Sequence, residues 1–250
     1  MTLGLNKNQI NRFSRQIILK DIGAHGQKKI LDSKVLIIGM GGLGCPVAEF
    51  LTRAGVGELG IVDYDNVDLS NLHRQSLYDN EDLKKPKVKV ASKKLKKINP
   101  KVKIRSYKIK LNNHNFKKII NKYDYIIDGS DNFKTKFLVN NFCLKFKKYL
   151  VTGAISKFDG HIFSFNFKNK KNPCLKCFFQ EENISDDILN CEYEGVLGTV
   201  AGIIGTFQAN EVLKQILNIG KNLEGFVLVV DLLNLNFRKV KLKKRKNCLC

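Results

Sequence analysis

The chain has 250 residues, of which 43% are hydrophobic and 9% aromatic, as in soluble globular proteins. Its most apolar stretch, 195–209, is short and glycine-rich, whereas a membrane-spanning helix needs about 20 apolar residues. The N-terminus lacks the basic and apolar regions of a secretory signal. We therefore predict a cytoplasmic protein with no membrane partner.

The formal net charge of +21 raises the question of a nucleic-acid partner. Lysine supplies 37 of the 44 basic residues, whereas bidentate contacts to phosphates and bases favour arginine. The densest basic region, 84–110, alternates lysine with apolar residues, as a solvated surface does. We interpret the charge first as solvated surface, second as attraction for an acidic protein, and only third as a nucleic-acid site.

Strands and helices alternate along most of the chain. In the first half, the pattern predicts two short helices within 8–31, a strand at 33–39, a helix at 44–54, a strand at 58–63, a helix at 87–98 and a strand at 101–107. A weak helix at 115–120, a strand ending at 128 and a helix at 132–146 follow. The last part has two strands within 149–167, a mostly irregular stretch at 173–194, a helix at 197–217, and strands at 226–231 and 237–242. This order predicts an α/β, Rossmann-like, mostly parallel sheet with antiparallel additions in the C-terminal half.

The chain has no evident linker or internal repeat. We therefore predict a single domain, 1–250, with N-terminal helices in 1–31, a nucleotide-binding part in 33–150 and a further part in 151–250.

A glycine-rich loop follows the first strand. Gly39, Gly41 and Gly44 form G-x-G-x-x-G, with Gly42 between them, immediately before a predicted helix. Such glycines permit a tight turn, a close approach to phosphate and close packing of helix on strand, and the helix N-terminus attracts anions. Asp63 ends the next strand, where an acid can accept hydrogen bonds from ribose hydroxyls. The loop predicts nucleotide binding but leaves an NAD(P)-dependent dehydrogenase open.

The stretch VDYDNVDLSNLHRQ, 62–75, follows that acid in place of another regular helix. Asn71, Arg74 and the later Lys87 have a spacing too irregular for one helix face. An amide, a guanidinium and an ammonium that converge on a glycine loop would surround a triphosphate. Dinucleotide enzymes bind one pyrophosphate and seldom need so many cations. The stretch therefore favours ATP.

Seven cysteines without a secretory signal do not indicate a disulfide framework. Cys174 and Cys177 form C-x-x-C, and Cys248 and Cys250 form C-x-C at the end of the chain. Four thiolates can enclose Zn²⁺ as a closed structural site. The C-x-C spacing is tight for two ligands, so two unrelated thiols on a frayed tail are the alternative.

Taken together, these motifs resemble the ThiF/MoeB/HesA group of adenylyltransferases, the bacterial relatives of ubiquitin-activating enzymes. The resemblance covers nearly the whole chain. It rests on RFSRQIIL (12–19), GMGGLG, AGVG (54–57), DYDNVDLSNLHRQ, PKV, INP (98–100), DGSDN (128–132), CLKC (174–177) and the final cysteines. One departure is the second cysteine pair, which in the family is usually C-x-x-C.

The resemblance implies ATP-dependent adenylylation of the C-terminal glycine carboxylate of a small ubiquitin-like sulfur carrier, MoaD- or ThiS-like, with release of pyrophosphate. It implies that 151–250 binds the carrier and zinc. A separate donor, a cysteine desulfurase or a rhodanese-like protein, would then supply sulfur for a thiocarboxylate. The pathway, molybdopterin, thiamine or another, stays open.

The resemblance also implies roles for single residues. Asp131 matches the aspartate that organises Mg²⁺, and Arg15 matches an arginine that reaches the phosphates from the partner subunit of a homodimer. Cys191 matches a cysteine that can join covalently to the carrier in thiamine-branch relatives. The alternatives are a helix N-cap for Asp131, a surface ion pair for Arg15 and no essential role for Cys191. Asp128 receives no catalytic role.

Two other functions stay open from the sequence. An ATP-dependent tRNA-modifying dehydratase shares the fold, and the charge of +21 is compatible with it. The zinc cysteines and the SNLHRQ stretch favour a protein carrier instead. A dehydrogenase fits the glycine loop, but the sequence offers no site for hydride transfer.

Overall fold

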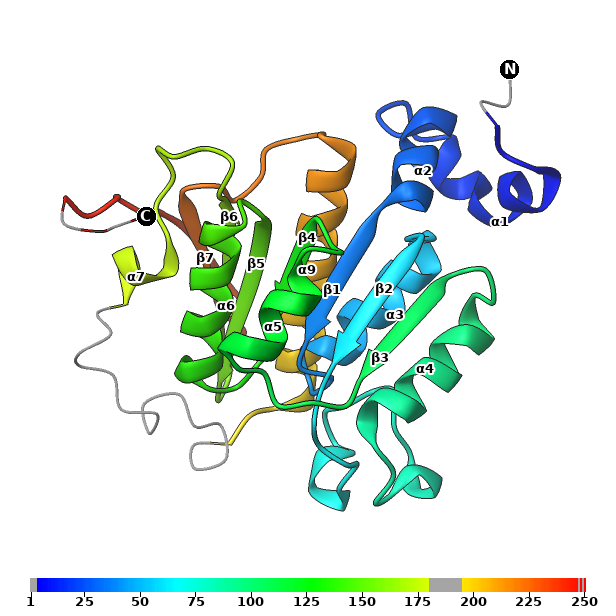
Figure 1. The fold of residues 1–250 in the computed structure, drawn as a ribbon, viewed down its shortest axis with the longest axis horizontal. Coiled ribbons are helices and arrows are strands. Elements are labelled where there is room, and N and C mark those ends of the chain that lie inside the picture. The colour runs from blue at the N-terminus through cyan, green and yellow to red at the C-terminus, as the bar shows by residue number, and fades with distance from the viewer. Residues whose placement is uncertain (1–3, 180–194, 247, 249) are drawn as a thin grey trace.

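The structure, a computed structural model, describes residues 4–179, 195–246, 248 and 250. Its N-terminal helices agree with the predicted pair: α1 is Lys7–Ile17 and α2 is Gly23–Asp32. Helix α1 begins at a capping box, in which the Asn6 side chain accepts from the Gln9 N–H and the Gln9 side chain accepts from the Asn6 N–H. Both helices lie beyond the amino end of the first strand (Figure 1).

One eight-stranded sheet, ordered β3-β2-β1-β4-β5-β6-β7-β8, runs through the protein (Figure 1). The strands are β1 (Lys34–Ile38), β2 (Glu58–Val62), β3 (Lys103–Tyr107), β4 (Tyr125–Asp128), β5 (Tyr149–Ser156), β6 (Asp159–Asn166), β7 (Phe226–Asp231) and β8 (Asn236–Lys241). The pairs among β1 to β5 are parallel, and β5 to β8 pair antiparallel. The prediction of a mostly parallel sheet with antiparallel additions is confirmed.

Helices cover both faces of the parallel part (Figure 1). Strand β1 is buried on both sides, so its alternate side chains enter different cores: Val35 and Ile37 join one, and Leu36 and Ile38 the other. The first core is closed by α3 (Gly44–Ala54), α4 (Lys87–Ile98) and α9 (Gly198–Leu217), and the second by α5 (Asn113–Ile120) and α6 (Phe133–Lys145). Within the described residues, no helix combines the length and apolar composition that crossing a bilayer requires.

Strand order reverses at β1. The chain passes from β1 to β2 on one side, whereas β4 pairs with β1 on the other. In open parallel sheets, ligands bind in the crevice outside the carboxyl ends of the strands at such a switch point. Segments 39–43, 63–68 and 129–132 leave the sheet at this edge and are well placed to form a site.

Candidate active site and cysteine cluster

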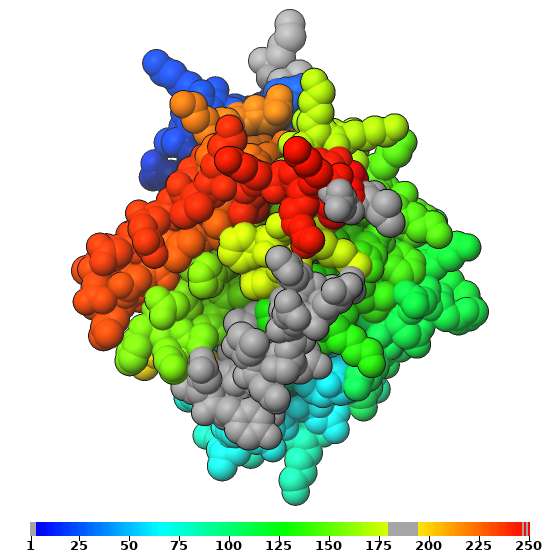
Figure 2. Space-filling view, turned by 90° about the vertical axis from the view of Figure 1, so that its left-hand side faces the viewer, coloured from blue at the N-terminus to red at the C-terminus, as the bar shows by residue number. Residues whose placement is uncertain are grey.

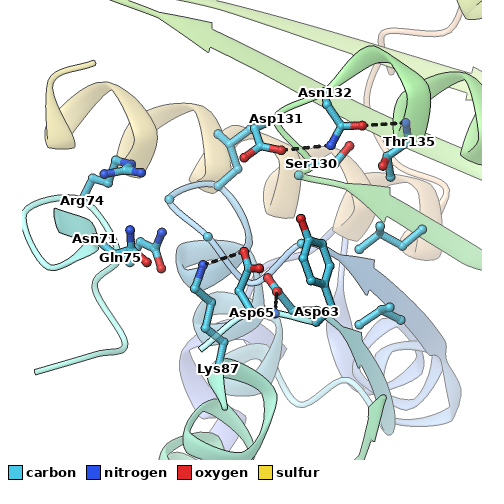
Figure 3. A pocket seen from close by; sticks show the side chains of 18 of the residues that line it. Asp63, Asp65, Asn71, Arg74, Gln75, Lys87, Ser130, Asp131, Asn132 and Thr135 are labelled. Carbon is cyan, nitrogen blue, oxygen red and sulfur yellow. Dashed lines mark hydrogen bonds and ion pairs between the residues drawn. The ribbon is translucent and has the colours of Figure 1, made fainter. Parts of the chain in front are cut away.

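A cavity of about 400 Å³ lies at the carboxyl ends of β1, β2 and β4 (Figure 3). Its size is within the range of small-ligand sites, about 300–1,000 Å³. Most of the residues that the sequence predicted for nucleotide binding line it: Gly39, Gly41, Gly42, Asp63, Asn71, Arg74, Lys87 and Asp131. Segments that are far apart in the chain therefore meet at one cavity.

The glycine loop depends on two backbone positions. Gly39 has φ +85°, and a Cβ there would lie 2.9 Å from the Gly129 carbonyl oxygen. A Cβ at Gly44 would overlap the Gly39 carbonyl oxygen. Gly44 therefore permits the start of α3 to pack against the loop, and it is not among the residues that line the cavity.

The Asp63 carboxylate ties β2 to the glycine loop. Its Oδ2 accepts from the Met40 N–H at 2.7 Å and its Oδ1 from the Asp65 N–H at 2.8 Å. Burial raises the pKa of Asp63, although the Lys87 charge and both hydrogen bonds oppose that shift. The group is thus held rigidly at the position predicted for a ribose contact.

Lys87 brings a positive charge to the cavity. It is the first residue of α4, directly after the N-cap residue Pro86. The Lys87 side chain is only 7% exposed, and its Nζ lies 3.3 Å from Asp65 Oδ2. The nearly buried ammonium thus faces the Asp65 carboxylate, which is itself 45% exposed, and its charge also acts on Asp63.

The stretch after Asp63 is irregular because it folds as a 3-10 turn, η1 (Leu69–Asn71), and not as a helix. The Arg74 N–H donates to the Asn71 carbonyl oxygen at 3.1 Å, and Arg74 Nη1 donates to the Ser70 carbonyl oxygen at 2.8 Å. A Cβ at Gly198, the first residue of α9, would overlap the His73 carbonyl oxygen. The turn is therefore held closely against the N-terminus of α9.

The loop after β4 presents Asp131 to the cavity. Asn132 is the N-cap of α6, since its Oδ1 accepts from the Thr135 N–H at 2.9 Å. The alternative reading of Asp131 as that cap is therefore wrong. Asp131 is exposed, and its Oδ1 accepts only from Asn132 Nδ2, at 3.1 Å, among the described residues. Its carboxylate is directed at the cavity from the wall opposite Lys87 (Figure 3).

A buried ion pair beneath this loop was missed by the sequence analysis. Lys136 Nζ lies 3.2 Å from Asp128 Oδ2 and donates to the Gly153 carbonyl oxygen at 2.6 Å. Asp128 Oδ2 also accepts from Thr152 Oγ1, and Oδ1 from the Ser130 N–H and hydroxyl. Asp128 thus anchors the loop that carries Asp131. A lysine within a helix usually faces solvent, so the sequence carries no signal that Lys136 is buried.

Removal of the Lys136 ammonium should destabilise the protein strongly. The side chains of Lys136 and Asp128 are 4% and 1% exposed, so Lys136→Met leaves a buried carboxylate without its cation. We expect a loss of about 3–5 kcal/mol in the free energy of unfolding, measured by urea denaturation. Adding Asp128→Asn should restore part of the lost stability.

Lys28→Met, in an exposed pair with Asp32, is the control and should cost under about 1 kcal/mol. Equal losses for the two single variants would contradict the prediction.

One predicted residue, Arg15, is not brought to this cavity by its own chain. Arg15 is exposed on α1, at the opposite end of β1 from the glycine loop, and does not line the cavity (Figure 1). Cys191 lies outside the described residues.

The four cysteines form a second, separate site. The Sγ atoms of Cys174, Cys177, Cys248 and Cys250 all lie within 4.8 Å of one another. The Cys174–Cys248 and Cys177–Cys250 Sγ distances are both 3.5 Å, close to the roughly 3.8 Å that tetrahedral metal–sulfur bonds of about 2.3 Å would give.

Burial raises the pKa of the Cys174 thiol to about 11, which a bound cation would oppose. Figure 2 shows the C-terminal segment lying against the segment of α7 (Leu175–Phe178). The tight C-x-C spacing of Cys248 and Cys250 therefore does not prevent both thiols from approaching Cys174 and Cys177. The cluster suits a metal ion with four thiolate ligands.

Fold and cavity define a Rossmann-like α/β protein with a glycine loop at the switch point of its sheet. The sequence pattern of the ThiF family matches residues 13–250, and the chain belongs to that family.

Curated relatives agree with this assignment. The sulfur carrier protein adenylyltransferase of Thermus thermophilus is 39% identical over 245 residues, which cover 97% of this chain and 90% of the relative. The adenylyltransferase and sulfurtransferase MOCS3 of Xenopus laevis is 42% identical over 243 residues, which cover 97% of this chain and 53% of the relative. The chain thus spans about half the length of the MOCS3 relatives.

Solved structures support the fold. E. coli MccB with ATP superposes with a TM-score of 0.82 at 22% identity, over 96% of this chain and 74% of that one. MccB with MccA-N7isoASN gives a TM-score of 0.84 at 19% identity, over 99% and 75%.

Proposed function

We propose that the protein is an ATP-dependent adenylyltransferase that acts on the C-terminal glycine carboxylate of a small ubiquitin-like sulfur-carrier protein. The observation that carries the proposal is the cavity itself, where Arg74 and Lys87 stand beside the glycine loop and Asp131 faces them (Figure 3). The names of the curated relatives point to the same activity.

The site suits a reaction between two anions. A carboxylate oxygen of the carrier attacks the α-phosphorus of ATP, and the bond from that phosphorus to the bridging oxygen of the leaving pyrophosphate breaks. An acyl-adenylate and pyrophosphate result. The nucleophile is already ionised, so no general base is needed. Arg74 and Lys87 neutralise phosphate oxygens, and Asp131 would hold Mg²⁺, which supplies further positive charge when bound.

ATP–pyrophosphate exchange tests this function. Exchange should require both the enzyme and a carrier that ends in Gly-Gly, and a carrier without its last glycine is the matched control. Failure with every ubiquitin-like carrier of the source organism, under conditions in which ATP binds, would refute it.

We further propose that Cys174, Cys177, Cys248 and Cys250 hold a structural Zn²⁺. A site closed by four thiolates leaves no position for a substrate. Protein purified without added metal should contain about one equivalent of zinc by elemental analysis. Cys250→Ser should lose most of the metal and lower Tm, whereas Cys143→Ala, a buried cysteine outside the cluster, should retain it. Metal well below one equivalent in the unmodified protein would contradict the proposal.

The partners and the location follow from the same hypothesis. We propose a homodimer in which Arg15 of one subunit completes the site of the other. We also propose a separate sulfur donor and a cytoplasmic location. Cys191 remains a candidate for the sulfur relay.

A further inference from the structure

Gln75 occupies a position in the cavity to which neither the motifs nor the proposed chemistry assign a role. It follows Arg74, and its side chain is buried, with only 3% of the residue exposed. Its backbone is fixed at both ends, because its N–H donates to the Asn71 carbonyl oxygen and its carbonyl oxygen accepts from the Tyr78 N–H. Gln75 Nε2 lies 3.6 Å from the place where a Cβ of Gly41 would stand. The carboxamide therefore sits on the middle glycine of the loop.

The hydrogen bonding of this side chain is incomplete. Gln75 Oε1 is one of four buried side-chain atoms without a partner in the described part of the chain. Two others belong to Gln208 and Gln215, and in both of these the Nε2 donates, to the Asp128 carbonyl oxygen and to Ser164 Oγ. Gln75 Nε2 makes no such bond to the described residues and borders the cavity. Gln75 thus carries an unpaired oxygen without the compensating structural bond that the other two glutamines make.

An unpartnered buried amide oxygen destabilises a protein, and an apolar side chain of the same length would avoid that penalty. The part of Gln75 that is free to act is the Nε2, which faces ligand space. Its surroundings indicate the ligand: Asn71, Arg74 and Lys87 line the same space, beside the loop (Figure 3). A cavity wall so rich in donors and positive charge suits a ligand made of acceptors, such as a chain of phosphates.

We propose that Gln75 is a polyphosphate-binding residue, whose Nε2 donates a hydrogen bond to a phosphate oxygen held over Gly41. The inference rests on the proposed function, in which ATP is the nucleotide, and adds a contact to its phosphate chain. Gln75 contacts phosphates and not the base or ribose, because the predicted ribose acceptor, Asp63, directly follows β2 whereas Gln75 covers Gly41.

Gln75→Met separates this role from a structural one. Methionine is of similar length and removes both the unpaired oxygen and the donor. We expect the ligand-free variant to be as stable as the wild type or more so, with an unchanged or higher Tm. Its Kd for Mg-ATP, measured by titration calorimetry without any carrier, should rise by roughly tenfold or more, as for the loss of a hydrogen bond to a charged group. Its Kd for adenosine should not change. Gln75→Glu should weaken ATP binding further, because it places a carboxylate beside the phosphates.

Gln215→Met is the matched control. It makes the same substitution at a buried glutamine that does not line the cavity and whose Nε2 bonds Ser164, so Tm should fall while the Kd for ATP stays within about twofold. Equal ATP affinity in Gln75→Met and wild type would overturn the inference, as would a lower Tm with unchanged binding or an equal loss for adenosine. Since these titrations contain no carrier, a missing exchange reaction with normal ATP binding would refute the proposed function and leave the Gln75 contact standing.

Discussion

Replacement of Asp131 by Asn should reduce carrier-dependent ATP–pyrophosphate exchange by about 10²–10³-fold while leaving the fold intact, as expected when one well-placed electrostatic group is lost. The Asp131 carboxylate is exposed and accepts only from Asn132 Nδ2 among the described residues, so its removal breaks no buried contact. An unchanged Tm together with a large loss of activity would show that Asp131 serves the reaction and not the stability of the fold.

Asp124→Asn is the matched control. Asp124 immediately precedes β4, at the end of the strand remote from Asp131, and its nearest cation is Lys148 Nζ at 3.9 Å. We expect exchange within about twofold of wild type, since the Asp124 side chain is 63% exposed and an ion pair this long contributes little. Exchange by Asp131→Asn at a rate similar to that of this control would show that the reaction does not depend on Asp131.

The sequence predicted the sheet well because its strands are buried on both faces. Strands β1 and β4 appear as short apolar runs that end in Gly39 and Asp128, and parallel strands align their carboxyl ends at one edge. The sequence predicted Asn71, Arg74 and Lys87 near the glycine loop, and all three line the cavity at that edge. Boundaries were less exact: β3 begins at Lys103, two residues later than predicted, because the Val102 N–H closes a turn on the Asn99 carbonyl oxygen.

Other features of the site depend on contacts that a linear pattern does not encode. Lys136 has the composition of a surface residue, and it is buried only because Asp128 and the Gly153 carbonyl oxygen from β5 meet it below the loop. Likewise, Asn132 and Asp131 are both good N-cap residues, and the backbone geometry of the loop selects Asn132. Gln75 is visible in the SNLHRQ stretch, but its unpaired oxygen is a property of the folded packing alone.

The second large effect concerns Arg15, which we expect to act in the cavity of a second subunit and not in its own. Arg15 lies on α1, beyond the amino end of β1, whereas its own cavity lies at the carboxyl ends of the strands, so it could reach phosphates only in another copy of the chain (Figure 1). Arg15→Ala should lose exchange by at least about tenfold, as when a charge-assisted contact is removed. Arg12→Ala is the control on the same helix. Its guanidinium donates to the Ile98 carbonyl oxygen of its own chain, and exchange should stay near wild type.

Mixed dimers give the decisive measurement. Arg15→Ala and Asp131→Asn subunits, coexpressed with different tags, should form heterodimers with one intact site, made of Asp131 from the first subunit and Arg15 from the second. Random pairing gives about half heterodimers, so the mixture should recover about one quarter of wild-type exchange, more than either variant shows alone. If both residues served one site within a single chain, every subunit of the mixture would lack one of them. Purified heterodimers with no more exchange than the parents would therefore exclude a shared site, because symmetry gives a closed dimer no other way to combine the two intact residues.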